Sequence, residues 1–451
     1  MLRTLSRPLV AGVEKWLPSA LVFAVVLTGI VGVLALVLTD TGPVEVLRGW
    51  GDGLTGLLAF MTQMALILLL GYTLANTRQV RRLLVRAASL PRTPVQAYAG
   101  VTLAAALGSL LSWGLGLVVG ALLAKEMAQQ GRERGMRLHF PLLVACGYAG
   151  YVVWHMGYSG SGPLAAATPG SFVEEQLGRT VPVSETIFAP WNLAAIVVTV
   201  VVVVAAMASL RPKPEDRIVE LPRDAVTEPL TDAGTTHRDR VVSPAERIDT
   251  SRVITTSAGL VLVAYLVTYF AQEGFALTLD IVNWTFLAAI LLLVRSPVEL
   301  GRLIGDAARN VGDILLQFPL YAGILGIMTT SGLITVFADF FVELASPATL
   351  GLWAFLSGGL INMFIPSGGG QFAVQAPIFL EAAGQLDVAP EVVIMGIAYG
   401  DQWTNMIQPF WALPVLAIAR LGIRDILGYT AIALLVSGVV FGATMVLVGA
   451  G

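Results

Sequence analysis

Two ionisable side chains stand inside stretches of the sequence that are otherwise apolar. Asp401 follows Gly400 in the second half of the chain, and His155 lies in an interrupted apolar stretch of the first half. A carboxylate within hydrocarbon is costly and usually marks the path of an ion or a proton. A histidine can donate a hydrogen bond to such a carboxylate or titrate with it. We therefore expect Asp401, with Gln402 beside it, to bind a coupling ion, Na+ or H+, and we expect no other metal and no cofactor.

These residues also have purely structural interpretations. Asp401 could cap the second half of a broken helix by accepting hydrogen bonds from its first N–H groups. His155 could be a core histidine whose ring nitrogens are satisfied by neighbours. Tryptophans near the same positions could line a pocket for an apolar ligand, or could serve only as packing and interfacial anchors. They are Trp113, Trp154, Trp403 and Trp411.

Short polar strings rich in small residues surround the two ionisable groups. Small residues let a ligand approach the backbone, while hydroxyls and amides can complete its shell of hydrogen bonds. The first N–H groups of a helix that restarts after an interruption favour an anion. Because we expect no lysine or arginine deep in any span, an anion should be bound by helix ends and neutral donors. The candidate ligand-binding residues are Ser112, Trp113, Gly114, His155, Ser159, Ser161, Ser367, Gly368, Gly369, Gly370, Gln371, Trp403, Thr404 and Asn405.

The segments that carry these strings are apolar enough to lie in a membrane. The 451 residues are 56% hydrophobic and only 13% charged, with a mean hydropathy of +0.78, whereas soluble domains carry about 25% charged residues. Irregular backbone inside a membrane survives only within protein or beside a watery cavity. Paired interruptions, one set in each half, point to the binding site of a transporter. We therefore predict an all-α polytopic membrane protein that moves a solute.

Loop charge predicts how the interrupted segments enter the membrane. Loops 76–94 and 125–139 are both basic, and basic loops remain on the cytoplasmic side. Segment 97–124 between them should therefore be a re-entrant hairpin with its tip at 112–116. Acidic flanks place a second hairpin, 348–383, on the opposite face with its tip at 366–371. Segments 140–168 and 392–419 should be discontinuous transmembrane helices, interrupted at 155–163 and 400–405.

The same reasoning divides the chain into two repeats of inverted topology. The first repeat covers 1–210, and the second lies within 253–451 after a connector helix at 253–271. Gly114 and Gly116 align with Gly368 and Gly370 at one constant spacing. The polar, proline-containing segment 211–252 reads as a cytoplasmic linker, so the N-terminus is expected to be cytoplasmic as well. Amphipathic segments at 78–90 and 333–346 should lie along the membrane faces.

Two strings of the sequence carry a resemblance to a known family. I-N-M-F-I-P-S-G-G-G-Q-F-A-V-Q-A-P spans 361–377, and Y-G-D-Q-W-T-N-M-I-Q-P-F-W-A-L-P spans 399–414. Both resemble the AtoE-type short-chain fatty acid transporters. The stretch S-W-G-L-G-L-V-V-G-A-L-L-A-K-E (112–126) is similar as well. The resemblance covers nearly the whole chain outside the linker. It implies an ion-coupled carrier for short monocarboxylates such as acetoacetate or butyrate, in the cell membrane. It also implies membership of the broader ion transporter superfamily, with inverted repeats and elevator-type alternating access.

Other functions stay open at this point. A carrier of a dicarboxylate is a near alternative, although the lack of buried basic residues favours a single carboxylate. An intramembrane enzyme using His155 and Asp401 would need a nucleophile, and the sequence has no G-x-S-x-G string, nucleotide-binding loop or metal-binding cluster. A passive channel would conduct current without alternating access. The single cysteine, Cys146, excludes a disulfide framework. The partners we expect are the lipid bilayer and the substrate, with no nucleic acid; a homodimer is compatible with the sequence.

Overall fold

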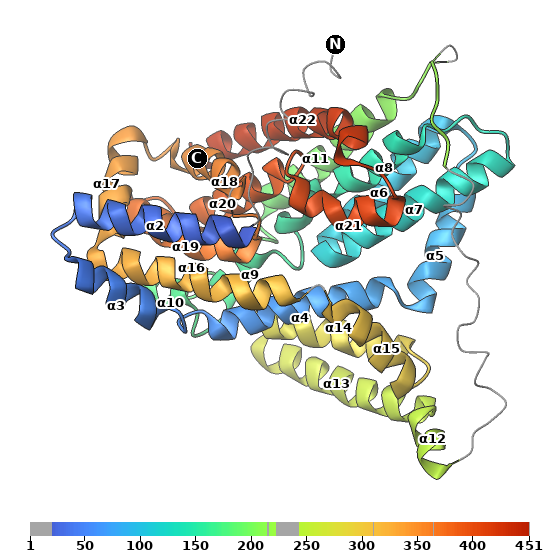
Figure 1. Cartoon of the computed structure of the whole chain (residues 1–451), viewed down its shortest axis with the longest axis horizontal. Coiled ribbons are helices and arrows are strands. Elements are labelled where there is room, and N and C mark those ends of the chain that lie inside the picture. The colour runs from blue at the N-terminus through green and yellow to red at the C-terminus, as the bar shows by residue number, and fades with distance from the viewer. Residues whose placement is uncertain (1–19, 214–215, 222–242, 310, 364, 451) are drawn as a thin grey trace.

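The computed structural model describes residues 20–213, 216–221, 243–309, 311–363 and 365–450, and every regular element in these ranges is a helix (Figure 1). The first half forms α2 (Ala20–Leu38), α3 (Pro43–Gly53), α4 (Leu58–Ala75), α5 (Arg78–Ser89), α6 (Pro94–Leu111), α7 (Trp113–Glu133), α8 (Phe140–Ala149), the 3-10 helix η1 (Gly150–Met156), α9 (Ser161–Ala167), α10 (Phe172–Leu177) and α11 (Pro190–Ser209). The second half forms α12 (Pro244–Asp249), α13 (Arg252–Glu273), α14 (Leu279–Leu293), α15 (Pro297–Ala308), α16 (Gly312–Ser331), α17 (Leu333–Leu344), α18 (Leu350–Asn362), α19 (Gly368–Gln385), α20 (Pro390–Thr404), α21 (Pro409–Ala419) and α22 (Ile423–Gly449).

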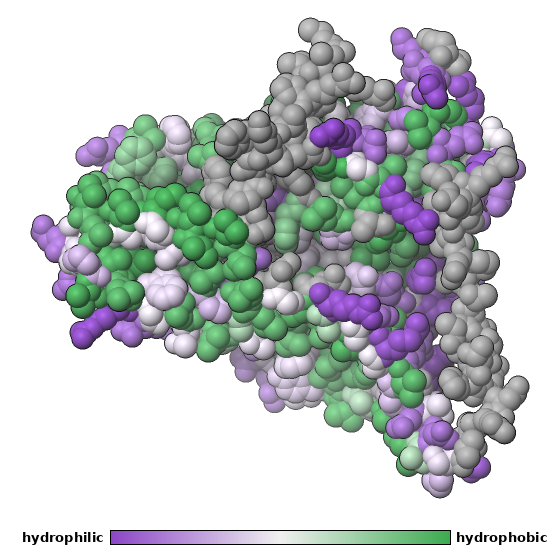
Figure 2. Space-filling view, viewed as in Figure 1, coloured by the Kyte–Doolittle hydropathy of each residue, from purple (hydrophilic) through white to green (hydrophobic). Residues whose placement is uncertain are grey.

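Six of the described helices are long and apolar enough to cross a membrane. They include α11 and α13, and most of the residues in the apolar window of α13 remain outside the protein core. Large apolar side chains such as Val37, Val261 and Val439 are more than two-thirds exposed. Figure 2 shows this apolar surface over α2, α3 and neighbouring helices, with polar residues gathered at the two ends of the molecule. An apolar surface of this extent needs lipid or protein to cover it, which confirms the all-helical membrane class.

The helices pack as two groups. One group, the frame group, contains α2–α4 and α13–α16; α16 packs on α2, α3 and α4, while α14 and α15 pack on α4. The other, the hairpin group, contains α6–α9 with η1, α11, and α18–α22. The groups meet where α4 packs against α7 and where α16 packs against α19. The amphipathic helices α5 and α17 link the groups, because each follows a frame helix and contacts the hairpin group.

Helices α6 and α7 fold back on each other at one extended residue, Ser112 (φ −156°, ψ 132°). Their close contact depends on glycine, because a Cβ on Gly116 would lie only 2.6 Å from the Cα of Ser109. Helices α18 and α19 pack together in a similar way, and the Gln371 side chain donates a 2.7 Å hydrogen bond to the Gly358 carbonyl. Both segments are therefore helical hairpins. Their re-entry into a membrane and the inversion of the two halves stay predictions.

The second interrupted helix differs from expectation in one respect. We expected the interruption at Gly400–Asn405, but α20 continues through Thr404 and the irregular residues are 405–408. Pro409 begins α21, and the residue before a proline is disfavoured in the helical region; Gln408 is accordingly extended (φ −87°, ψ 123°). Gln408 also caps α21 by accepting from the Trp411 N–H. The interpretation of Asp401 as the cap of the second half-helix is therefore wrong.

Part of the expected linker is bound to the hairpin group. Val219 accepts a 2.8 Å hydrogen bond from the Phe140 N–H, and its own N–H donates 3.0 Å to Nδ1 of His139. Leu221 is buried. Residues 216–221 therefore form a structured attachment at the start of α8, whereas residues 222–242 of the expected linker lie outside the described part. In α8 itself, Cys146 is fully buried and packs as a small apolar residue.

Candidate functional site

His155 and Asp401 form a buried hydrogen-bonded pair between η1 and α20. Nδ1 of His155 lies 2.8 Å from Oδ2 of Asp401, and both side chains are fully buried. The Gly162 N–H donates a 2.9 Å hydrogen bond to the other ring nitrogen, Nε2. Because Nε2 accepts, the imidazole is neutral and its single proton sits on Nδ1, where it donates to Asp401. The pair can then carry its charge only on the Asp401 carboxyl group.

The second carboxyl oxygen of Asp401 has a different environment. Oδ1 is buried and has no hydrogen-bond partner among the described residues. A buried carboxylate oxygen without a donor is costly. A bound proton or cation would remove that cost. His155 is thus a buried residue that orients Asp401 through its Nδ1 hydrogen bond.

Further hydrogen bonds hold the pair in place and use several of the candidate polar residues. Oε1 of Gln402 accepts a 2.9 Å bond from the His155 N–H. The Asn362 side chain, at the end of α18, lies within hydrogen-bonding distance of the Asp401 carbonyl (2.9 Å), Thr404 Oγ1 (2.9 Å) and Asn405 Oδ1 (3.1 Å). The second hairpin is therefore bound to the interrupted helix through the backbone of Asp401 itself.

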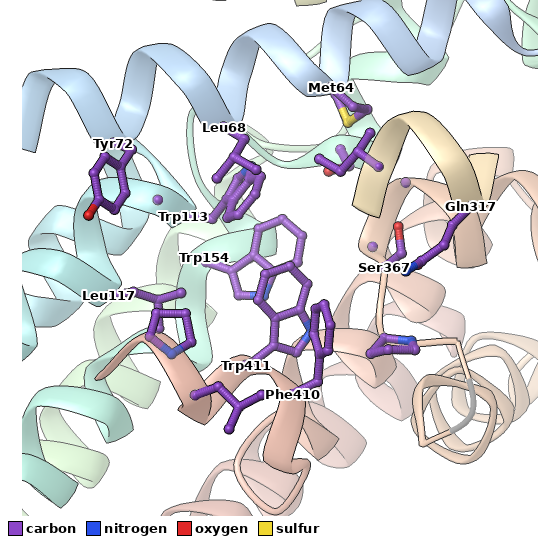
Figure 3. A pocket seen from close by; sticks show the side chains of 18 of the residues that line it. Met64, Leu68, Tyr72, Trp113, Leu117, Trp154, Gln317, Ser367, Phe410 and Trp411 are labelled. Carbon is purple, nitrogen blue, oxygen red and sulfur yellow. The ribbon is translucent and has the colours of Figure 1, made fainter. Parts of the chain in front are cut away.

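A cavity of about 260 Å³ lies beside this pair, between the frame group and the hairpin group (Figure 3). Its walls are mainly apolar and aromatic, and they come from both groups. The frame group contributes Met64, Leu68, Tyr72, Ile314, Gln317 and Phe318. The hairpin group contributes Trp113, Gly114, Leu117, Val118, Trp154, Ser161, Pro366, Ser367, Gly368, Gly369, Phe410, Trp411, Leu413 and Pro414. Pockets for drug-sized ligands usually measure about 300–1,000 Å³, so this volume suits a smaller molecule.

Six of the candidate residues line this cavity: Trp113, Gly114, Ser161, Ser367, Gly368 and Gly369. The pair lies directly behind them, because a Cβ on Gly368 would lie 3.1 Å from Oδ2 of Asp401 and would clash with the Trp154 ring. One glycine backbone therefore separates the cavity from the carboxylate. Gly368 is required here because any side chain would meet Trp154 or Asp401.

The remaining candidates lie behind the walls and do not line the cavity. The Ser159 hydroxyl accepts the Trp113 N–H at 3.1 Å, Gln371 bonds within its hairpin, and Gly370 faces the Tyr321 ring. Trp403 lies on the far side of α20, where its indole donates 2.7 Å to the Leu434 carbonyl. These residues, together with Ser112, Gln402, Thr404 and Asn405, support the site rather than contact its contents.

Four helices begin at the cavity, and each has part of its first turn already paired. At α9, Gly162 donates its N–H to His155 and Pro163 has none, while α21 is capped by Gln408. At the hairpin tips, the Trp113 N–H of α7 donates to Ser159, and the Gly370 N–H of α19 donates to Ser367. The remaining first-turn N–H groups lack partners within their own helix. The positive ends of four helices therefore meet at the cavity, two of them at the hairpin tips.

Arg309 is a functional candidate that the sequence did not reveal. It lines the cavity at the end of α15, and its side chain is 82% exposed, with Nη2 3.8 Å from Oδ1 of Asp306. In the sequence it belongs to a basic loop, and nothing local distinguishes it from Arg302. The apolar lining residues of α4 and α16 were missed for a similar reason, since leucine facing a cavity and leucine facing lipid look alike in sequence.

Comparisons with known proteins find relatives along nearly the whole length of the chain. A family model described as "Short chain fatty acid transporter" matches residues 1–448. An Escherichia coli (strain K12) protein is 43% identical over 441 residues, and a Haemophilus influenzae protein is 38% identical over 447 residues; each alignment covers 98% of both chains. Both proteins are provisionally named short-chain fatty acid transporters.

Two solved structures share the fold at low sequence identity. The YdaH transporter of Alcanivorax borkumensis has a TM-score of 0.59 at 17% identity, with 96% of this chain and 98% of that chain covered. MtrF of Neisseria gonorrhoeae, described as an antimetabolite efflux pump, has a TM-score of 0.51 at 15% identity, with coverage of 98% and 97%. At these identities the likeness establishes the fold alone.

Proposed function

Because the chain belongs to the short-chain fatty acid transporter family, we propose that it is a secondary carrier of small monocarboxylates such as butyrate or acetoacetate. Membership of a transporter family, and six described helices long and apolar enough to cross a membrane, support this proposal. The observation that carries the proposal is the small cavity between the two hairpin tips. It offers two positive helix ends to a carboxylate and apolar walls to a short hydrocarbon chain.

One carboxylate fits this cavity better than two. Among the described lining residues only Arg309 carries a positive charge, and it lies at the exposed rim. A second carboxylate would find only neutral donors such as Tyr72, Gln317 and Ser161. Burying a charge that is not paired with an opposite charge is strongly unfavourable. The substrate class proposed is therefore a monocarboxylate and not a dicarboxylate.

We propose that Asp401 carries the coupling cation, H+ or Na+. Its Oδ1 has no partner among the described residues. Only Gly368 separates the Asp401 carboxyl group, where the cation would bind, from the cavity that would hold the substrate carboxylate. The two opposite charges would partly cancel. Because an isolated charge is expensive in a membrane, substrate and cation should cross together more easily than either alone.

The movement proposed is of the elevator type, with the hairpin group shifting against the frame group. The cavity takes its walls from both groups, so a shift of one past the other would change the side from which it opens. We also propose that the hairpins are re-entrant, that the two halves have inverted topology, and that the carrier resides in the cell membrane. The basic helix α5 and the region of α12 lie toward one end of the molecule, and α3 and α17 toward the other (Figure 1). By the positive-inside rule, the first end is cytoplasmic; the N-terminus, which we also expect to be cytoplasmic, lies outside the described residues.

Purified protein in proteoliposomes tests this function. We expect radiolabelled butyrate to accumulate above equilibrium when either an inward proton gradient or an inward sodium gradient is imposed, and the effective gradient identifies the ion. Product analysis should recover butyrate chemically unchanged. Uptake equal to that of protein-free liposomes under both gradients would contradict the proposal.

Replacing Arg309 by glutamine should raise the KM for butyrate roughly threefold while leaving the maximal rate nearly unchanged. An exposed cation at the rim attracts an anion before it binds, and this attraction is screened by salt. The salt dependence of KM should therefore weaken in the variant. Arg302→Gln, an exposed residue on the same helix, is the matched control and should behave like the original protein. An unchanged KM at low salt in Arg309→Gln would contradict the role of Arg309.

A further inference from the structure

Two indole N–H groups at the cavity have no acceptor. Trp154 is 1% exposed and Trp411 is 9% exposed, both line the cavity, and the Nε1 atom of each is buried without a hydrogen-bond partner among the described residues. An indole N–H can only donate. Buried donors are almost always paired in native proteins. Two unpaired donors on residues of one cavity wall therefore point to a ligand that accepts hydrogen bonds and that moves the side chains covering the two N–H groups when it binds.

The two rings are held firmly by their neighbours. In the 3-10 helix η1, residues three apart lie on one face, so Trp154 stacks on Tyr151 at 5.8 Å and 12°. Its ring also stacks on His155 at 4.2 Å and 17°. Trp411 stands in the first turn of α21 and meets the Trp113 ring edge-on at 5.4 Å. Figure 3 shows Trp113, Trp154 and Trp411 gathered at the centre of the site.

The surroundings of these donors favour an anion over a neutral acceptor. A Cβ on Gly368 would clash with the Trp154 ring, so the positive end of α19 begins directly beside Trp154. A helix N-terminus favours negative charge. A carboxylate also has two oxygens that can accept from separate donors.

We propose that the carboxylate of the transported acid binds to the indole N–H groups of Trp154 and Trp411. The hydrocarbon chain then lies against the apolar wall formed by Leu68, Leu117 and Val118. This inference rests on the proposed function and names the residues that recognise the substrate. It also links binding to coupling, because Trp154 stacks on His155, the residue that orients Asp401.

A binding experiment on the purified full-length protein tests the inference without requiring transport. Butyrate and butyramide, which has a similar shape but no charge, are titrated by calorimetry into the original protein and into Trp154→Phe and Trp411→Phe. Phenylalanine keeps an aromatic ring and removes the N–H. We expect each substitution to weaken butyrate binding by about tenfold, as for a hydrogen bond to a charged group, and to weaken butyramide binding by only about threefold, because a neutral amide oxygen accepts a weaker hydrogen bond. Trp284→Phe on α14, which does not line the cavity, should leave both affinities unchanged.

A second readout observes the unsubstituted protein directly and uses the variants only to assign its signals. With 15N-labelled tryptophan, the indole N–H resonances of Trp154 and Trp411, assigned from the two variants, should shift on addition of butyrate, and the resonance of Trp284 should not. Unchanged butyrate affinity in both variants, equal weakening of butyramide, or stationary indole resonances would each overturn the inference. If one of these results is obtained but butyrate is still transported, the inference about the two tryptophans fails and the proposed function holds. If the original protein neither binds nor transports butyrate, both fail.

Discussion

Replacing Asp401 by asparagine should abolish cation-driven accumulation of butyrate while exchange of butyrate across the membrane persists. Asparagine keeps the shape of the side chain, and its carbonyl can still accept the Nδ1–H of His155, which lies 2.8 Å from Oδ2 in the original pair. It cannot bind a proton or neutralise a cation. A tenfold gradient of one coupled ion stores about 1.4 kcal/mol and supports at most roughly tenfold accumulation. In the variant that accumulation should fall to the equilibrium level.

The measurement is radiolabelled butyrate uptake in proteoliposomes, with and without the cation gradient, followed by counterflow against unlabelled butyrate. Asp339→Asn is the matched control, because Asp339 is an exposed carboxylate on α17, outside the cavity lining, that accepts a hydrogen bond from Gln385 of α19. The control should accumulate butyrate normally. Full accumulation by Asp401→Asn would show that the coupling ion binds elsewhere.

Gly369→Val should abolish butyrate uptake while the protein still reaches the membrane. Gly369 stands in the first turn of α19 and faces the frame group, where a Cβ would lie 3.0 Å from Phe60 and 3.2 Å from the sulfur of Met64. Valine adds two further methyl groups in this space. Overpacking of this kind costs about 1–3 kcal/mol, and here the cost falls on the contact between hairpin tip and frame. We expect the uptake rate to fall by at least about tenfold.

Gly384→Val controls for the substitution itself. Gly384 lies on the same helix, near its other end, and nothing surrounds its Cβ position within 4 Å. This variant should show nearly normal uptake at equal protein levels in the membrane. Normal uptake by Gly369→Val, measured in the same preparation, would exclude a tight passage between the hairpin tip and α4.

Much of the helical order could be read from the sequence because its signals are local. Long apolar runs, together with the glycine and proline strings that interrupt them, predicted both hairpins and both interrupted helices to within a few residues. The interruption after α20 was placed too early because Gly400 reads as a helix breaker in the sequence. The helix in fact continues through Gly400 and ends shortly before Pro409. Short helices such as α3 and α15 were missed because they lack a long apolar period.

The site depends on contacts that no local signal carries. His155 and Asp401 are 246 residues apart, and only the correspondence between the two halves suggested that they meet. The tautomer of His155 follows from the Gly162 N–H, which a sequence does not place. The sequence also could not separate residues that line the cavity, such as Gly369, from residues that support the wall, such as Gln371, because alternate sides of one helix turn carry them.

The buried position of Cys146 gives this chain a practical property. With its only native thiol enclosed inside α8, the unmodified protein already serves as a background for site-directed labelling. A cysteine introduced at Glu175 or at Glu133, both exposed, would be the single reactive sulfur. An impermeant reagent applied to whole cells would then report which end of the molecule faces outward. Paired spin labels, one on α19 and one on α4, would record the distance between the two helix groups during turnover.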